Sequence, residues 1–184
     1  MCDKTFCGLA IAFFSIFLSS FITGNSYAVN NSNGNTSLVA KGRSECLELS
    51  LALEKNYFTT GEHVNTKLTL KNISGKIISI EYFPNMPFNI LLYDGNGELI
   101  ETFRGPRAAS MMRPFTLELG IGDNIFKEFS FNINHPSGEY DLAGVFIGIV
   151  TIKSQGSSSN NIFQQHCKMT GKTLMTELIP ITIT

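Results

Sequence analysis

The chain has 184 residues, of which 43% are hydrophobic, and its formal net charge is −1 at neutral pH. A charge this close to zero argues against a surface built to bind nucleic acid or an anionic membrane. The length suits one domain with a substantial hydrophobic core.

The first 28 residues have the pattern of a secretory signal peptide. A short segment containing Lys4 precedes an apolar run over residues 7–22, and the small residues Ser26 and Ala28 place a cleavage point after Ala28. An uncleaved membrane anchor is the alternative, but a spanning helix needs about 20 apolar residues. We therefore expect a secreted or periplasmic protein with no membrane span after cleavage.

Residues 29–44 are rich in Asn, Ser, Gly and Thr and contain little that can be buried. They are predicted to form a disordered polar leader, followed by one domain over residues 45–184. Asn30, Asn35 and Asn72 each begin an Asn-x-Ser/Thr sequon. These sequons are glycosylation candidates if the source is eukaryotic and carry no meaning if it is bacterial.

Cys46 and Cys167 are the two cysteines that remain after processing. An even pair in an exported chain favours a disulfide between the first strand of the domain and its C-terminal region. Two buried free thiols are the alternative.

The domain begins with strict alternation, since Leu47, Leu49, Leu51 and Leu53 are separated by polar or small residues. This period of two is typical of a strand with one face in the core. Further strands are expected over residues 64–70, 77–83, 88–93, 98–103, 116–121, 125–133, 162–168 and 173–184. No segment has the helical spacing of apolar residues, so no helix is expected beyond that of the signal peptide.

Residues 94–97 read Asp-Gly-Asn-Gly and indicate a tight hairpin turn between two of these strands. Residues 139–153 run without a helix breaker and are rich in aromatic and β-branched side chains, which predicts a central strand buried on both faces. Gly138 and Tyr140 at its start have the form of a tyrosine corner. Together, the pattern predicts an all-β, immunoglobulin-like antiparallel β-sandwich of eight to nine strands.

Catalytic and metal-binding motifs are missing from the sequence. His63, His135 and His166 have no metal-ligand spacing with one another, and the neighbours His166 and Cys167 would point to opposite faces of a strand. There is no nucleophile motif and no phosphate-binding glycine loop. We expect no metal, no cofactor and no enzymatic activity.

The connection between the strands around residues 98–103 and 116–121 has the composition of an interface. Arginine, methionine and aromatic residues are enriched at the energetic centres of protein interfaces. The candidate contact residues are Arg104, Arg107, Met111, Met112, Arg113 and Phe115. The alternative is a crossover between sheets whose apolar residues lie under a sheet edge.

Several of these features resemble two known families. The Leu70-Lys71-Asn72 strand end, the turn at residues 94–97 and the run from Pro136 to Tyr140 resemble the intracellular proteinase inhibitor (BsuPI-type) domain. Residues 93–140, with Gly105, Arg107 and Pro114, are similar to the β-sandwich pro-domain of deuterolysin-type zinc endopeptidases. Both resemblances imply a non-catalytic sandwich that contacts a proteinase. We expect the chain to differ from the first family through its predicted signal peptide and from the second through the absence of a metalloprotease domain.

These observations predict an exported, monomeric, non-catalytic module that binds another protein. A secreted protease is the most concrete partner, which would make the chain a proteinase inhibitor. The alternative is a structural or adhesive module of the cell surface or envelope with no protease target.

Overall fold

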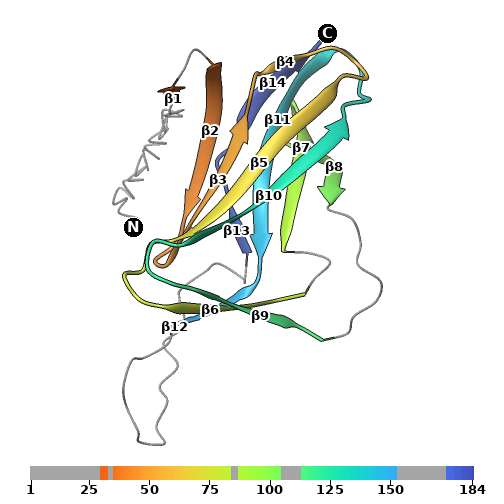
Figure 1. The fold of residues 1–184 in the computed structure, drawn as a ribbon. Helices are drawn as coiled ribbons and strands as arrows, with labels where there is room; N and C mark the ends of the chain where they lie inside the picture. The colour runs from red at the N-terminus through yellow and green to blue at the C-terminus, as the bar shows by residue number, and fades with distance from the viewer. Residues whose placement is uncertain (1–29, 33–34, 84–86, 105–112, 153–172) are drawn as a thin grey trace, which may run out of the picture.

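The computed structural model describes residues 30–32, 35–83, 87–104, 113–152 and 173–184, which form fourteen strands and no helix (Figure 1). The strands are β1 Asn30–Ser32, β2 Asn35–Arg43, β3 Leu47–Leu53, β4 Tyr57–Phe58, β5 His63–Asn72, β6 Ile78–Tyr82, β7 Phe88–Asp94, β8 Leu99–Arg104, β9 Phe115–Leu119, β10 Asn124–Asn132, β11 Gly138–Ile147, β12 Ile149–Ile152, β13 Thr173–Met175 and β14 Ile179–Ile183. Within these ranges there is no candidate for a membrane-spanning helix. The predicted signal peptide lies outside them.

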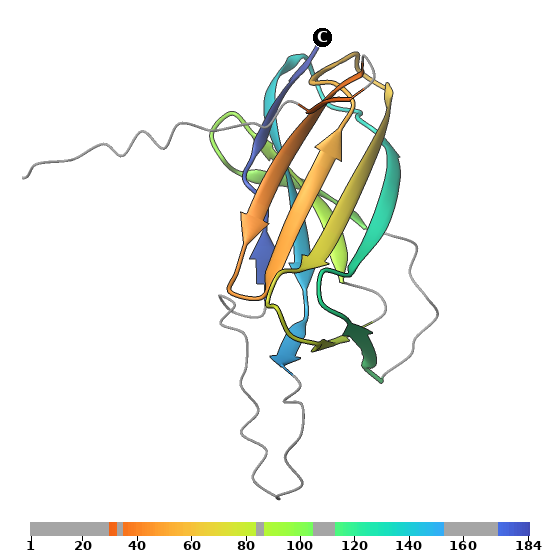
Figure 2. The same cartoon turned by 60° about the vertical axis from the view of Figure 1, so that its left-hand side comes forward.

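Two main sheets form an immunoglobulin-like β-sandwich, which confirms the predicted fold class. The first sheet has the strand order β1-β2-β3-β5-β10. The second has the order β4-β14-β11-β7-β8, and β13 also pairs with β11. A small third sheet, β12-β6-β9, lies across one end of the sandwich (Figures 1 and 2). Pairing is antiparallel throughout these sheets except between β14 and the two-residue β4.

Alternating side chains of the main strands build the core. All four leucines of β3 that the sequence pattern singled out are at most 1% exposed, whereas the residues between them are only partly buried. From the second sheet, Ile90, Leu92, Leu142 and Phe146 are completely buried in the same cluster. Burial of one such side chain stabilises the fold by about 1.5–3 kcal/mol. The two sheets therefore enclose one continuous core.

The predicted disordered leader is wrong over residues 35–43. These residues form β2, which pairs with β3 from Leu38 opposite Leu53 to Arg43 opposite Glu48. Leu38 packs against the core and Ala40 is 1% exposed. This segment has few apolar side chains that could be buried. Its backbone hydrogen bonds to β3 hold it in the sheet. The domain thus begins before residue 45.

The predicted strand over residues 139–153 is central but divided. β11 pairs with β14 on one side and with β7 on the other, as expected for a central strand. After Gly148 the chain changes sheet, and β12 pairs with β6 instead. A Cβ atom at Gly148 would lie 2.7 Å from the Phe146 ring, so the missing side chain lets the backbone pass close to this ring.

The other C-terminal predictions have two different outcomes. The strand predicted over residues 173–184 is also divided, into β13 and β14. Between them, the backbone N–H of Thr176 donates to Gly144 O at 2.9 Å, and Thr176 Oγ1 accepts from Gly144 N–H at 2.9 Å. The strand predicted over residues 162–168 lies outside the described residues.

The hairpin predicted at residues 94–97 joins β7 and β8. The N–H of Gly97 donates to Asp94 O at 2.9 Å, and Gly97 has a φ of 81°, the left-handed conformation that glycine tolerates. The Asp94 carboxylate accepts from the backbone N–H groups of Asn96 and Glu98 at 2.9 and 2.8 Å. The hairpin loop therefore has three residues, 95–97, rather than two. Gly97 of the Asn-Gly pair supplies its left-handed conformation.

Tyr140 makes the hydrogen bond that the tyrosine-corner pattern predicts. Its hydroxyl donates to Pro136 O at 3.0 Å, four residues upstream. The Tyr140 ring also packs against the core and lies 5.9 Å, centroid to centroid, from the His135 ring. This bond ties the entry of β11 to the preceding turn.

We expect Tyr140→Phe to lower the free energy of unfolding by about 1 kcal/mol, because the hydroxyl bond is lost while the ring remains. Tyr93→Phe is the matched control, since the Tyr93 hydroxyl contacts only Met175 Sδ, at 3.8 Å, among the described residues. Urea denaturation of both variants measures the difference. Equal stabilities of the two variants would contradict the role of the Tyr140 bond.

The structure describes one cysteine of the predicted disulfide, Cys46. Cys46, just before β3, is 2% exposed and belongs to the core cluster. Cys167 lies outside the described residues, so its pairing with Cys46 stays a prediction.

Candidate functional site

The predicted contact residues fall at the two ends of the connection between β8 and β9. Arg104 is the last residue of β8 and is exposed. Arg113 is exposed, and Phe115 is the first residue of β9, not a loop residue. Three of the six candidates lie outside the described residues: Arg107, Met111 and Met112.

Phe115 is one of three aromatic residues at one end of the small sheet that we call the aromatic end, defined by Tyr82, Phe83 and Phe115. Tyr82 and Phe115 are opposite each other in the pairing of β6 with β9, and their rings stack with centroids 6.3 Å apart. Phe115 is 44% exposed and Phe83, which directly follows β6, is 58% exposed. This end of the small sheet therefore carries exposed aromatic surface, and Arg113 stands two residues before Phe115 in the chain.

The arginines on both sides of the connection are free to bind an outside group. Within the described ranges, no carboxylate lies within 4.0 Å of the guanidinium groups of Arg104 or Arg113. In contrast, Arg43 forms an ion pair with Glu48. Unpaired arginines and exposed aromatic rings are both typical of the energetic centres of protein interfaces.

Sequence reasoning found Arg113 and Phe115 but missed the other two aromatic residues. Tyr82 and Phe83 stand at the end of the strand predicted over residues 77–83, for which no contact role was proposed. The signal that could have found them is the aromatic pair followed directly by a proline, where the strand must end. Their position beside Phe115 depends on the pairing of β6 with β9, which no local pattern reveals.

A hydroxyl, an imidazole and an amide stand in the order found in hydrolytic triads: those of Ser130, His63 and Asn132. Ser130 Oγ lies 2.5 Å from His63 Nε2, and His63 Nδ1 lies 2.7 Å from Asn132 Oδ1. Ser130 Oγ also donates to Asn65 Oδ1 at 2.7 Å. All four side chains are exposed on the outer face of the first sheet, whereas a catalytic triad acts in a site from which water is excluded. The arrangement is a hydrogen-bonded network of polar side chains on the sheet surface.

Shifted pKa values do not gather at one place among the described residues. Hydrogen bonding from Lys55 is the main cause that holds the pKa of Glu62 below its usual value. Backbone N–H groups of its own turn lower the pKa of Asp94. Burial, together with the neighbouring charge of Glu139, raises the pKa of Asp141. Each shift has a local structural cause, unlike the clustered shifts that mark active sites.

The described histidines have partners other than metal ligands. His63 contacts Asn132 and Ser130, and His135 Nε2 lies 2.7 Å from Glu101 Oε2. Groups of three or more His, Cys, Asp or Glu side chains that could hold a metal ion are absent from the described ranges. His166 lies outside these ranges.

No protein-family model and no curated protein matches the chain. The resemblance to the two proteinase-associated families has no support from these sequence comparisons. The structure supports only the β-sandwich fold that both families imply.

Solved structures that are similar to this chain include the following three. The C-terminal domain of Wzt is 11% identical with a TM-score of 0.40, over 79% of this chain and 70% of that one. The CARDB domain of a Pyrococcus furiosus protein in complex with metal ions is 12% identical with a TM-score of 0.38, over 77% and 91%. The sporulation control protein Spo0M from Bacillus subtilis is 18% identical with a TM-score of 0.40, over 75% of this chain and about half, 49%, of its own length. At this level of likeness, none of the three carries an argument about function.

Proposed function

We propose that this chain is an exported, non-catalytic module that binds another protein through its aromatic end, and that inhibition of a secreted proteinase is the most concrete form of this binding. The observation that carries the proposal is the exposure of Phe83 and Phe115 at one end of the small sheet, with the unpaired Arg113 two residues before Phe115 in the chain. Large exposed apolar groups are costly in water, and partner binding removes that cost.

The aromatic side chains and the arginine would have different roles in binding. Phe83 and Phe115 would bury their rings in the partner, while Arg113 would attract an acidic region of the partner and orient the encounter. The stacked ring of Tyr82 supports Phe115 from the core side, so that Phe115 loses little conformational freedom on binding. A rigid aromatic group on a strand is a better anchor than one on a flexible chain.

Inhibition assays with a panel of secreted proteases and micromolar protein test the proposal. We expect inhibition of at least one protease, and we expect Phe115→Ala to weaken it by at least about ten-fold, as for an interface hot spot. Phe126→Ala is the matched control, because Phe126 is an exposed phenylalanine, 55% exposed, on a strand of the first sheet. Thermal unfolding of both variants shows whether either change harms the fold.

The outcomes separate the two versions of the proposal. Unchanged hydrolysis by every protease would exclude inhibition. Capture of a protein partner that requires Phe115 and Arg113 would then support the broader binding function. Capture of a surface or envelope component that is indifferent to both residues would overturn the aromatic end as the site and favour a structural or adhesive module.

A further inference from the structure

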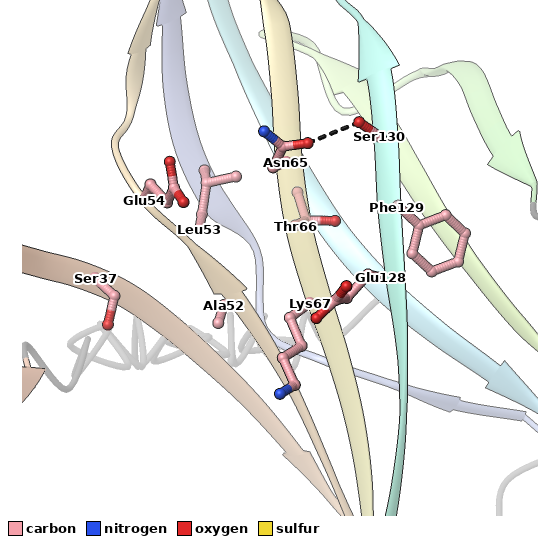
Figure 3. Close-up of a pocket in the computed structure, with 10 residues that line it drawn as sticks. All are labelled: Ser37, Ala52, Leu53, Glu54, Asn65, Thr66, Lys67, Glu128, Phe129 and Ser130. Atoms are coloured by element: carbon pink, nitrogen blue, oxygen red, sulfur yellow. Dashed lines mark hydrogen bonds between the residues drawn. The ribbon is translucent and has the colours of Figure 1, made fainter.

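The outer face of the first sheet is hollowed where four strands meet. The hollow has a volume of about 580 Å³ and lies over β2, β3, β5 and β10 (Figure 3). Its outward-pointing side chains are Ser37, Ala52, Asn65, Lys67, Glu128 and Ser130, with Glu54 at its edge just after β3. A volume of this size falls within the range of small-molecule sites.

Strand register explains why the face is hollow at this place. Lys67 stands opposite Ala52 on one neighbouring strand and opposite Glu128 on the other. The Lys67 Nζ atom lies over the Phe126 ring, 3.9 Å from its centroid, so its side chain leans toward Phe126. In Figure 3 the small side chain of Ala52 lies between those of Ser37 and Lys67. The short Ala52 side chain thus forms the floor of the hollow, and polar side chains surround it.

The polar groups on one side of the hollow are held in place before any ligand arrives. Asn65 accepts a hydrogen bond from Ser130, and Ser130 in turn contacts His63, which contacts Asn132. This chain of short contacts, between 2.5 and 2.7 Å, fixes the Asn65 and Ser130 side chains. Pre-ordered groups lose less conformational entropy when they bind, which favours a polar ligand.

Free hydrogen-bonding capacity remains at the hollow. No described residue pairs with the carboxylates of Glu54 or Glu128, and the amide nitrogen of Asn65 has no partner in the described ranges. Two carboxylates and one ammonium give the lining a net charge of −1, which disfavours phosphate, sulfate or an acidic sugar. Carboxylate, amide and hydroxyl groups together suit a neutral ligand that both donates and accepts many hydrogen bonds.

We infer that this hollow binds a neutral oligosaccharide. Sugar hydroxyls can donate to the carboxylates of Glu54 and Glu128 and exchange hydrogen bonds with Asn65 and Ser130, at a site whose open, shallow form admits a chain of rings. The hollow lies on a different sheet from the aromatic end, so saccharide binding is independent of the protein-binding function proposed above.

Amide chemical-shift titration of the purified protein with neutral oligosaccharides tests the inference. The probes are cellohexaose, xylohexaose, mannohexaose, maltohexaose and chitohexaose, each raised to roughly 10 mM, at which even weak binding is visible. We expect at least one of them to shift the signals of Ala52, Asn65 and Ser130. Asn65→Ala and Glu128→Gln should each weaken that binding by about ten-fold. The first removes the amide and its hydrogen bonds, and the second replaces one charged acceptor oxygen with an amide nitrogen that cannot accept from a sugar hydroxyl.

Glu81→Gln is the control variant for charge removal, since Glu81 is exposed on the small sheet away from the hollow. It should bind the sugar as tightly as the unchanged chain, and the thermal midpoints of all variants should agree if the fold is intact. Unshifted signals with all five sugars would overturn the inference. So would binding that survives both Asn65→Ala and Glu128→Gln, or a preference for a sulfated oligosaccharide over every neutral one.

Discussion

Gly42→Ala should lower the free energy of unfolding by about 3 kcal/mol or more, at the upper end of what overpacking causes. A Cβ atom at Gly42 in β2 would lie 1.8 Å from the carbonyl oxygen and 2.7 Å from the carbonyl carbon of Met175. Both atoms belong to the backbone, so no change of rotamer can relieve the clash. Nearby, the N–H of Glu177 donates to Lys41 O at 3.1 Å, which holds the two segments together.

Urea denaturation measures this change, with Gly95→Ala as the matched control. A Cβ atom at Gly95 would lie 3.6 Å from its nearest neighbour, Glu139 O, an ordinary contact. The control should therefore stay within about 0.5 kcal/mol of the unchanged protein. If residues 35–43 were a disordered leader, Gly42→Ala would be equally harmless. The experiment thus tests directly whether β2 closes this side of the sandwich.

The second large effect is expected for Asn72→Ala, with a loss of about 3 kcal/mol in the free energy of unfolding. Asn72, the last residue of β5, is 1% exposed. Its amide nitrogen donates to Lys76 O at 2.7 Å, Leu119 O at 3.1 Å and Gly120 O at 2.7 Å. Its amide oxygen accepts from the N–H and the hydroxyl of Ser74, at 3.0 and 2.7 Å. Alanine would leave these groups without their partner.

Asn96→Ala serves as the control for Asn72→Ala, because Asn96 is an exposed asparagine in the β7–β8 turn. It should cost no more than about 0.5 kcal/mol. Thermal or urea unfolding of the two variants gives the comparison. A loss below about 1 kcal/mol for Asn72→Ala would show that the carbonyls find other donors and that the amide does not connect these elements.

The same contacts argue against glycosylation of the sequon at Asn72. The nitrogen that would carry a glycan is buried and donates to three carbonyl groups. A sugar there is incompatible with this packing. Asn72 and Ser74 match a glycosylation pattern because their side chains form an Asx-type turn, in which asparagine and serine are favoured residues.

Local patterns were sufficient for the strands whose own side chains bury one face. The alternation of leucines in β3 and the turn chemistry between β7 and β8 depend on residues that are neighbours in sequence, and both predictions are confirmed. β2 was missed for the opposite reason. Among the side chains of β2 that the structure describes, Leu38 and Ala40 belong to the core, and the backbone of the strand pairs with β3.

The candidate sites show the same division. Arg113 and Phe115 could be found because interface-forming residues are concentrated in one short segment. Tyr82 joins Phe115 only through the pairing of β6 with β9. The hollow is harder still, because its lining comes from four strands and its polar residues are far apart in the sequence, from Ser37 on β2 to Ser130 on β10. Single polar residues on strands read as ordinary solvent-facing positions.

By itself, the sequence determined that this protein is an all-β sandwich, which side chains of the strand at residues 47–53 enter the core, and where the hairpin and the tyrosine corner form. Only the tertiary structure decided that residues 35–43 belong to the first sheet, that β11 and β12 are separate strands, and which polar groups meet over β5. The physical reason is that side-chain alternation is a local property with a period of two residues. Strand partners and register instead depend on contacts between segments far apart in the chain.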